Sequence, residues 1–518
     1  MPIYAYNGLV PVRKLVQKIP LYHSLVALTP TEALRSVTSK DGFGVYASSD
    51  TLFRGAVFGR DSLEVGEDLL LVKPKLVRTI LLTLACLQGV ETNQLTEEEP
   101  GKIVHEYRRA VVDGQPLDAE SRQIFEQLAN RWGGNAQELA YYGSVDATPL
   151  FVRLAAAYAR LYGKEILAEM VRQRDDHSIT LLAAVEDALD WLLLKLKASG
   201  SDFLEFKRLN PHGIDNQVWK DSKEFYIHAD GRLANHDQPI SSIEVQAVTY
   251  DALLAGRRLL PARSEELQAA ADRLQRAVFG QLWLAEPVYF ALGTDYNQAG
   301  ELRLITTMTA NPAEMLDSHI FDNLPPADKQ KHLGGLIPNI MGSDFLTDGG
   351  IRSRALSESR LVDYWDYHGS FTSWPKETYD IAKGLRRQGF AKLAEELENR
   401  LLNVVQAVRA YPEFVYIDAR GRVLGMAPRQ RNHGEIVHVE SSNHPEKTQA
   451  WTVSAVIAIN ASRRKLLKPK LQPQAAWQAE LEKDVLTYIP HVRRLRSAKE
   501  IAARYPAYPY KIKSGFSS

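Results

Sequence analysis

The stretch PISSIEVQAVTYDALLAGRRLL, residues 239–260, is a long apolar run whose large side chains recur at the spacing of a helix. Seven other segments show the same spacing, and they span 63–87, 148–162, 179–197, 265–284, 377–388, 391–408 and 448–459. Strand-like alternation is scarce. It is best developed at 414–423, where Asp418-Ala419-Arg420-Gly421 suits the turn of a hairpin. The pattern predicts an all-α fold with minor β-hairpins in its loops.

The composition excludes several classes of partner. The 63 basic and 63 acidic residues give a formal net charge of +0, so the chain lacks the positive field that attracts nucleic acid or an anionic membrane. No stretch reaches the roughly 20 apolar residues that span a bilayer, and the N-terminal sequence lacks the features of a signal peptide. The only cysteine, Cys86, lies in an apolar run, which favours an inert, buried thiol. We expect a cytoplasmic protein with an uncharged partner and no nucleic acid or membrane contact.

The segments between the expected helices are rich in Trp, Tyr, Asp, Glu, His and Gly. Two examples are GIDNQVWKDSKEFYIHADG at 213–231 and LVDYWDYHGSFTSWPKE at 361–377. No low-complexity linker or short-period repeat interrupts the chain, so solenoid architectures lack support. One large helical domain whose loops bind a ligand fits this pattern best.

Short motifs follow one another through these loops in a fixed order. They read FGRDSL at 58–63, EEEPGKIVHEYR at 97–108, YYGSVDATPLF at 141–151, NQVWKDSKEF at 216–225, HADGRLA at 228–234, PISSIEVQAVTYDAL at 239–253, DGGIRS at 348–353, YHGSFTSWPKE at 367–377, YPEF at 411–414 and TQAWTVSA at 448–455. In content and order the set resembles the catalytic domain of the amylo-α-1,6-glucosidases, the glycogen-debranching family, over about residues 53–459. The resemblance implies a toroid of six helical hairpins, (α/α)6, with the active site at the mouth formed by the loops.

The resemblance divides the chain into three parts. Residues 53–465 are expected to form the catalytic domain, residues 1–52 an N-terminal extension packed on it, and residues 466–518 a helical or irregular tail. Only about fifty residues precede FGRDSL, so neither the family's β-rich N-terminal domain nor a transferase domain is expected. The chain reads Trp374-Pro375-Lys376-Glu377 where relatives often have WPHD, and the segment between YPEF and TQAW is long.

The family activity is hydrolysis of an α-glucosidic bond. The resemblance implies an inverting enzyme that releases glucose from an α-linked glucoside or dextrin, with α-1,6 as the expected linkage. Inversion needs a carboxylic acid to protonate the leaving oxygen and a carboxylate to activate water, about 6.5–9.5 Å apart. No cofactor or catalytic metal is expected, because His433, His438 and His444 match no metal-binding pattern.

The match with NQVWKDSKEF puts the general acid at Asp221. Trp219 can desolvate this carboxyl, which would raise its pKa towards the value that a general acid requires. Lys220 would oppose the shift if its ammonium pointed at Asp221. The alternative interpretation is structural, because an Asp at this position commonly caps a short helix.

The general base is expected at Glu413, in a Pro-Glu-hydrophobic sequence similar to the one that holds the family's catalytic Glu. The competitors are Glu435 and Glu440, which lie in the long inserted segment and closer to TQAW. The sequence alone does not place that segment, so all three stay candidates. A loop Glu such as Glu413 is also commonly just an exposed residue.

Further residues are candidates for holding the sugar, which presents hydroxyl pairs and a flat apolar face. Arg60 and Asp61 resemble the family's clamp on the non-reducing-end sugar, and a surface salt pair is the alternative. The other candidates are Tyr142, Asp146, Trp219, Lys220, Glu244, Gln246, Trp374, Gln449 and Trp451. Asp146 also suits a helix start, and buried polar groups at Glu244 and Gln246 would need partners. Each tryptophan alone suits core packing equally well.

Two other functions stay open. The first is a toroid glycosidase or phosphorylase that acts on another glycoside, and phosphate-dependent product formation would identify a phosphorylase. The second is a non-catalytic glycan-binding protein, because a fold does not guarantee activity. Glycan binding without turnover would identify it. The exact linkage and the oligomeric state are not predicted.

Overall fold

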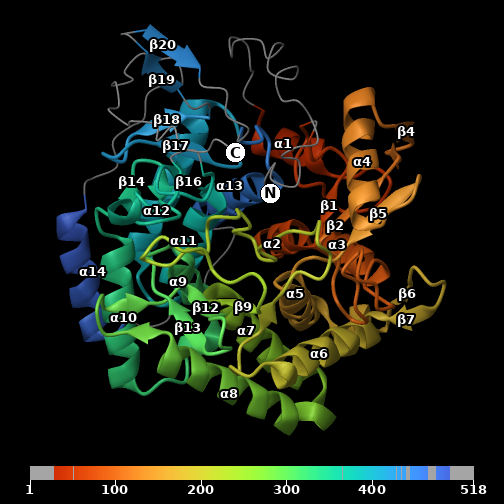
Figure 1. Cartoon of the computed structure of the whole chain (residues 1–518), viewed down its shortest axis with the longest axis horizontal. Coiled ribbons are helices and arrows are strands. Elements are labelled where there is room, and N and C mark those ends of the chain that lie inside the picture. Colours follow the sequence, from red (N-terminus) through yellow and green to blue (C-terminus); the bar gives the residue numbers. More distant parts are fainter. Residues whose placement is uncertain are drawn as a thin grey trace.

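The computed structural model describes residues 28–50, 52–363, 366–426, 429–432, 435–438, 444–464 and 474–489. The fourteen α-helices in these ranges follow one another around the molecule, and α13 returns beside α1 and α2 (Figure 1). None of the helices in the described ranges is long and apolar enough to cross a membrane.

Six helices contact one another in a closed cycle. They are α2 (Gly59–Leu69), α5 (Ala147–Tyr162), α7 (Ile243–Leu259), α9 (Asn311–Glu314), α11 (Pro375–Arg387) and α13 (Ala450–Arg463). Each packs against the next, and α13 closes the cycle by packing against α2. All residues from 243 to 256 of α7 are buried, as expected for a helix surrounded by others.

Six other helices alternate with these along the chain and pack outside them. They are α1 (Pro30–Val37), α3 (Pro74–Cys86), α6 (Leu181–Ala198), α8 (Ser264–Gln281), α10 (Pro326–Ile340) and α12 (Ala391–Val408). Among their partners, α1 contacts α13, α6 contacts α5 and α7, and α12 contacts α11. Two more helices, α4 (Ala119–Trp132) and α14 (Ala476–Tyr488), contact β5 and the pair α10 and α12, respectively.

The strands are short and lie in the connections between helices. They are β1 (Val57–Phe58), β2 (Glu106–Arg109), β3 (Val111–Val112), β4 (Gln115–Pro116), β5 (Glu138–Tyr141), β6 (Met170–Arg172), β7 (Ser178–Thr180), β8 (Glu205–Phe206), β9 (Ile240–Ser242), β10 (Trp283–Leu284), β11 (Tyr289–Phe290), β12 (Gly293–Tyr296), β13 (Leu302–Ile305), β14 (Leu346–Thr347), β15 (Gly350–Ile351), β16 (Thr372–Ser373), β17 (Val415–Ile417), β18 (Val423–Gly425), β19 (Arg429–Asn432) and β20 (Glu435–His438). The largest sheet has four strands in the order β13-β12-β9-β8.

Most helical predictions are confirmed, and the differences have local causes. The segment 63–87 is divided between α2 and α3, because Pro74 lacks an N–H and suits the first turn of a new helix. The segment 240–260 begins as β9 before α7. The hairpin expected at 414–423 is formed by β17 and β18, and Gly421 takes φ +75° in its turn.

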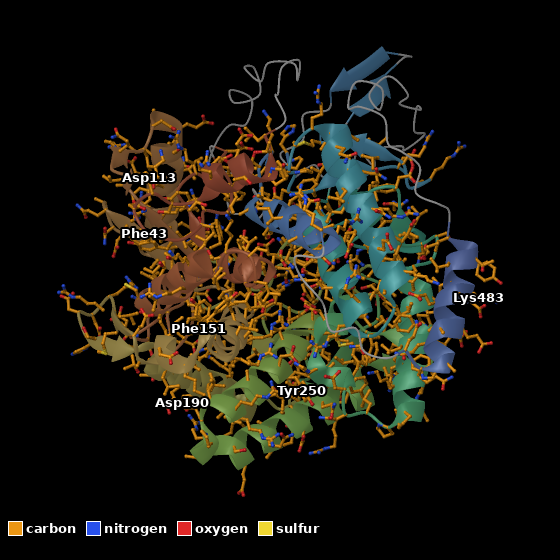
Figure 2. The ribbon with its side chains drawn as sticks, turned by 180° about the vertical axis from the view of Figure 1, so that it is seen from behind. Phe43, Asp113, Phe151, Asp190, Tyr250 and Lys483 are labelled. Carbon is orange, nitrogen blue, oxygen red and sulfur yellow. The ribbon has the colours of Figure 1, made fainter. Side chains whose placement is uncertain are left out.

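The core is continuous through the helical cycle. Phe151 of α5 and Tyr250 of α7 are buried within it. Figure 2 shows the fold from behind, with Lys483 of α14 at one edge of the molecule and Asp113 at the opposite edge.

Candidate active site

The candidate residues gather at one end of the helical cycle, where the inner helices begin. Arg60 and Asp61 lie in the first turn of α2, and Glu244 lies in the first turn of α7. Asp146, Trp374 and Gln449 directly precede α5, α11 and α13, respectively. Helices that share a buried cycle therefore bring residues far apart in sequence to one place.

Gly59 sets the start of α2 against a neighbouring strand. Its N–H donates to the carbonyl of His105 at 3.0 Å. A Cβ added at Gly59 would lie 2.0 Å from the carbonyl oxygen of Val104, which is closer than any real contact. Only glycine allows this approach, and the approach fixes the position of Arg60.

Arg60 and Asp146 form a buried ion pair. The Arg60 Nε donates to Asp146 Oδ2 at 2.7 Å, and both side chains are almost fully buried. The alternative of an exposed salt pair at Arg60-Asp61 is therefore wrong. Asp146 occupies the cap position of α5, but its side chain makes no capping bond. Its carboxylate instead holds Arg60 in place.

Asp61 lies between the arginine and the last inner helix. The Gln449 Nε2 donates to Asp61 Oδ2 at 3.3 Å. Burial raises the pKa of Asp61 to about 6, with Arg60 opposing the rise and Glu413 adding to it. The electrostatic influence of Glu413 on Asp61 places the predicted base in the neighbourhood of the predicted clamp.

Asp221 lies in an irregular loop and is almost fully buried. No helix begins at this residue, so the interpretation as a helix cap is wrong. The Tyr367 hydroxyl donates to Asp221 Oδ1 at 3.2 Å, and His368 Nε2 lies 3.6 Å from the same oxygen. Burial raises the pKa of Asp221 to about 7, although the positive charge of Arg60 opposes the rise. Asp221 can therefore hold a proton near neutral pH.

Aromatic rings build a wall beside Asp221. The ring of Trp374 stacks on His368 at 4.7 Å between centroids and meets the edge of Trp219 at 5.6 Å. Trp374 also lies 4.9 Å from Phe414 and 5.9 Å from Trp451. This wall connects the loop of the predicted acid to the segment of the predicted base, because Phe414 is the residue after Glu413. It also supplies the low-dielectric surroundings that raise the pKa of Asp221.

Trp219 is fixed from several directions. Its Nε1 donates to both carboxylate oxygens of Glu314 at 3.1 Å. The ammonium groups of Lys220 and Lys376 each lie 4.8 Å from its ring centroid. A cation near an aromatic ring is attracted by the ring quadrupole. The sequence did not indicate Glu314 or Lys376 as neighbours of Trp219, since these contacts join distant segments.

Glu244 lies in the first turn of α7. Its carboxylate accepts a hydrogen bond from Ser242, and burial raises its pKa. Together with Asp146 and Trp219 it lines a cavity of about 70 Å³. Arg60, Asp221 and Trp374 do not line this cavity.

Glu413 is almost fully buried, so the interpretation as an exposed loop residue is wrong. Its N–H donates to the carbonyl of Glu446 at 2.9 Å, and the Glu446 N–H donates to Glu413 Oε2 at 3.1 Å. The Glu446 carboxylate accepts a hydrogen bond from the Ser48 hydroxyl at 2.6 Å. The sequence did not indicate Glu446, because the two segments are brought together by pairing between distant parts of the chain, at the parallel bridge between Tyr411 and Thr448.

The other two base candidates lie between β18 and α13. Glu435 lies in β20, paired with Asn432 of β19. Glu440 lies outside the described residues, as does His433. Glu413 is the candidate whose side-chain contacts are described, and the choice among Glu413, Glu435 and Glu440 stays a prediction.

The polar side-chain atoms of three predicted substrate-binding residues form hydrogen bonds with other parts of the protein. The Tyr142 hydroxyl donates to the Leu87 carbonyl at 2.9 Å and accepts from Arg174 at 3.0 Å. The Gln246 amide nitrogen donates to the Leu204 carbonyl at 2.9 Å, and its oxygen accepts from the N–H of the same residue at 2.8 Å. Neither is brought to Asp221.

Lys220 is the third, because its ammonium is completely buried against protein acceptors. It donates to Asn311 Oδ1 at 2.9 Å and to the Glu377 carboxylate. The ammonium is therefore not presented to a sugar. These contacts also explain how Asp221 keeps a raised pKa with a lysine beside it in the chain.

Several buried polar atoms around Asp221 have no hydrogen-bond partner in the described part of the chain. They are Arg60 Nη2, Asp61 Oδ1, Asp146 Oδ1, Asp221 Oδ2, Gln449 Oε1 and Trp451 Nε1. Nearly all buried polar atoms in folded proteins are hydrogen-bonded. The group contains two donors and four acceptors, which matches a ligand with several hydroxyl groups because a hydroxyl both donates and accepts.

The chain was compared with known proteins. No protein-family model matches it, and no curated protein matches it. An uncharacterized conserved protein from Thermus thermophilus superimposes with a TM-score of 0.52 at 13% sequence identity, over 83% of this chain and 99% of that chain. A GH63 mannosylglycerate hydrolase from the same organism, in complex with Tris, superimposes with a TM-score of 0.52 at 13% identity, over 84% of this chain and 100% of that chain. The chain shares a helical fold with a glycosidase, and its membership of the debranching family stays a prediction.

Proposed function

We propose that the chain is a glycoside hydrolase that releases a terminal sugar from an α-linked glycoside, with Asp221 as general acid and Glu413 as general base. The observation that carries the proposal is Asp221 itself. It is a buried carboxyl with a pKa of about 7, surrounded by polar atoms that lack partners. A general acid works best when its pKa lies near the operating pH.

The surroundings of Asp221 match the needs of a bound sugar. Arg60, Asp61, Asp146 and Gln449 supply donors and acceptors for hydroxyl groups, and Trp374 and Trp451 supply flat apolar surface. We take the closed cycle of six inner helices, each alternating with an outer helix, to be the six-hairpin toroid that the loop motifs predict. The helical fold shared with a glycosidase and the buried Asp221 carboxyl are separate observations that support the proposal.

The proposed mechanism is inversion. Asp221 protonates the leaving oxygen while Glu413 takes a proton from a water that attacks the anomeric carbon from the opposite face. The Glu446 N–H, donated to Glu413 Oε2, holds that carboxylate in one orientation. We propose an α-glucoside with a 1,6 bond as substrate, on the strength of the loop motifs.

The proposal is tested by sugar release from a panel of glycosides. The panel comprises isomaltose, panose, maltooligosaccharides, limit dextrin and, because a structural neighbour hydrolyses it by name, mannosylglycerate. Wild-type protein should release a monosaccharide from at least one of them, and Asp221→Asn should release it about a hundredfold to ten-thousandfold more slowly. Equal rates for wild-type protein and Asp221→Asn would contradict the assignment, and product formation that requires inorganic phosphate would contradict hydrolysis.

A further inference from the structure

Lys220 is the neighbour of Asp221 in the chain, yet its ammonium is turned to other groups. It donates to Asn311 Oδ1 at 2.9 Å, to the carbonyl of Ser353 at 3.4 Å and to the carboxylate of Glu377. An ammonium has three protons, so these three acceptors use all of them. The structure records no ion pair between Lys220 and Asp221.

The Asp221 carboxyl would attract a free ammonium. Its Oδ1 accepts from Tyr367, whereas its Oδ2 is buried without a hydrogen-bond partner. The lysine side chain is long and flexible, and the two residues are adjacent in the chain. If the ammonium were released from its present acceptors, Asp221 would be the carboxyl nearest in sequence.

Glu377 is built to hold the ammonium. It lies in the first turn of α11, where the helix dipole favours a negative charge. One of its oxygens binds Lys220, and the other accepts from the Ser353 hydroxyl at 2.9 Å. The side chains of Glu377 and Lys220 are both fully buried. A charge pair buried in this way resists separation, because each partner would be left uncompensated.

We propose that Glu377 is a positioning residue that holds the Lys220 ammonium away from Asp221, so that Asp221 keeps the proton that it delivers. The proposal rests on the proposed function for the role of that proton. Glu377 touches neither the substrate nor Asp221 in this account, and it acts only through Lys220. An opposite charge within about 4–6 Å lowers the pKa of a carboxyl by about one to three pH units. Release of Lys220 would therefore leave Asp221 ionised at neutral pH.

The other charged groups around Asp221 and Glu377 do not take over the role of Glu377 in holding Lys220. Arg60 on α2 already opposes the raised pKa of Asp221. His368 faces Asp221 from the next loop, and burial holds its pKa well below the usual range, so it adds no positive charge near neutral pH. On the side of Glu377, the ammonium of Lys376 is nearby, and burial raises the pKa of the neighbouring carboxyls Glu314 and Glu244, which also face Lys220. Lys220 is the cation of the set that adjoins Asp221 in the chain.

The experiment is an infrared titration of the full-length protein, in which Asp221→Asn identifies the carboxyl band of Asp221. In wild-type protein this band should titrate near pH 7. In Glu377→Gln it should titrate about one to three pH units lower. In the double variant Lys220→Met/Glu377→Gln the titration should return to the wild-type value, because no ammonium is left to approach. Glu377→Asp keeps the charge but shortens its reach, and it should shift the titration in the same direction if Glu377→Gln does not fold.

Glu398→Gln is the matched control, because Glu398 is also a buried glutamate paired with an arginine, on the outer helix α12. It should leave the Asp221 titration unchanged. The proposal is overturned if Glu377→Gln and Glu377→Asp both titrate like wild-type protein, or if the double variant is shifted as much as Glu377→Gln. Failure of the proposed function would give a different result. In that case the titrations would behave as described, but wild-type protein would hydrolyse no glycoside.

Discussion

Asp221 differs from an ordinary surface aspartate by its burial and by the few groups that compensate its charge. The substitution Asp221→Asn, assayed with two kinds of substrate, tests whether Asp221 is the general acid. Hydrolysis of a glycoside with a poor leaving group should fall by about a hundredfold to ten-thousandfold. Hydrolysis of the matching glycosyl fluoride should fall far less, because fluoride hardly needs protonation to leave. Steady-state rates on both substrates check this, and an equal loss on both would argue against a general acid.

The same burial makes Asp221 costly for folding at neutral pH. Its pKa rises from 3.8 to about 7 on folding, so the folded state binds the proton more tightly than the unfolded state. Stability is therefore lost as the pH rises from about 4 to about 7. Each pH unit of that difference corresponds to ~1.36 kcal/mol, so Asp221→Asn should gain up to about 4 kcal/mol over wild-type protein at pH 8 and nothing at pH 4. Melting temperatures of both proteins at the two pH values measure this, and a variant that is less stable at pH 8 would contradict the raised pKa.

Glu413 and Glu446 are neighbouring buried carboxyls, and substitution distinguishes their roles. Burial, together with the nearby charges of Asp50 and Glu413, raises the pKa of Glu446 well above the usual range, which disfavours its ionised form. Glu413→Gln should therefore slow hydrolysis of both a glycoside and a glycosyl fluoride by about a hundredfold to ten-thousandfold, since both need an activated water. Glu446→Gln should change the rates only a few-fold. The reverse pattern, or loss of activity in Glu435→Gln or Glu440→Gln alone, would move the base to another residue.

Among the helices, α2 links the packing of the fold to the site most directly, because Gly59 at its start contacts Val104 and Arg60 follows in its first turn. Gly59→Ala puts a Cβ against the Val104 carbonyl, and the helix start must move away to relieve the clash. Overpacking of this kind costs about 1–3 kcal/mol, and Arg60 should move with the helix and weaken substrate binding. Gly200→Ala is the matched control, because nothing lies within 4 Å of its Cβ. The melting temperature and KM of the two variants test this, and two variants with equal values would contradict it.

The sequence predicted the elements better than their contacts. The long apolar periods marked α5, α6, α7, α8 and α12 because helical spacing is a local property. It did not mark α10, which contains Gly334, Gly335 and Pro338, all poor helix formers. The loop motifs identified Arg60, Asp146 and Asp221. They could not show that the side chains of Gln246 and Tyr142 form hydrogen bonds with backbone groups, or that Glu446 contacts Glu413. Those hydrogen bonds depend on pairing between distant segments.

At the scale of the whole molecule, the cycle of inner helices places the predicted site residues at one end. α2, α5, α7, α11 and α13 all present their beginnings to the same place, and α13 returns to α2 (Figure 1). The Arg60–Asp146 pair and Asp61 close part of this space with fully buried charges. A site closed in this way would suit the terminal sugar of a chain, and we propose on this ground that the protein acts from the end of its substrate.

Proton NMR of the first product tests whether the protein hydrolyses a terminal α-glycoside with inversion. The anomeric protons of the released sugar are followed in a reaction with an α-linked substrate before mutarotation mixes the anomers. We expect the β anomer of a monosaccharide to appear first and no internal oligosaccharide to be released. First appearance of the α anomer would contradict inversion, and release of internal oligosaccharides would contradict a site closed around the terminal sugar.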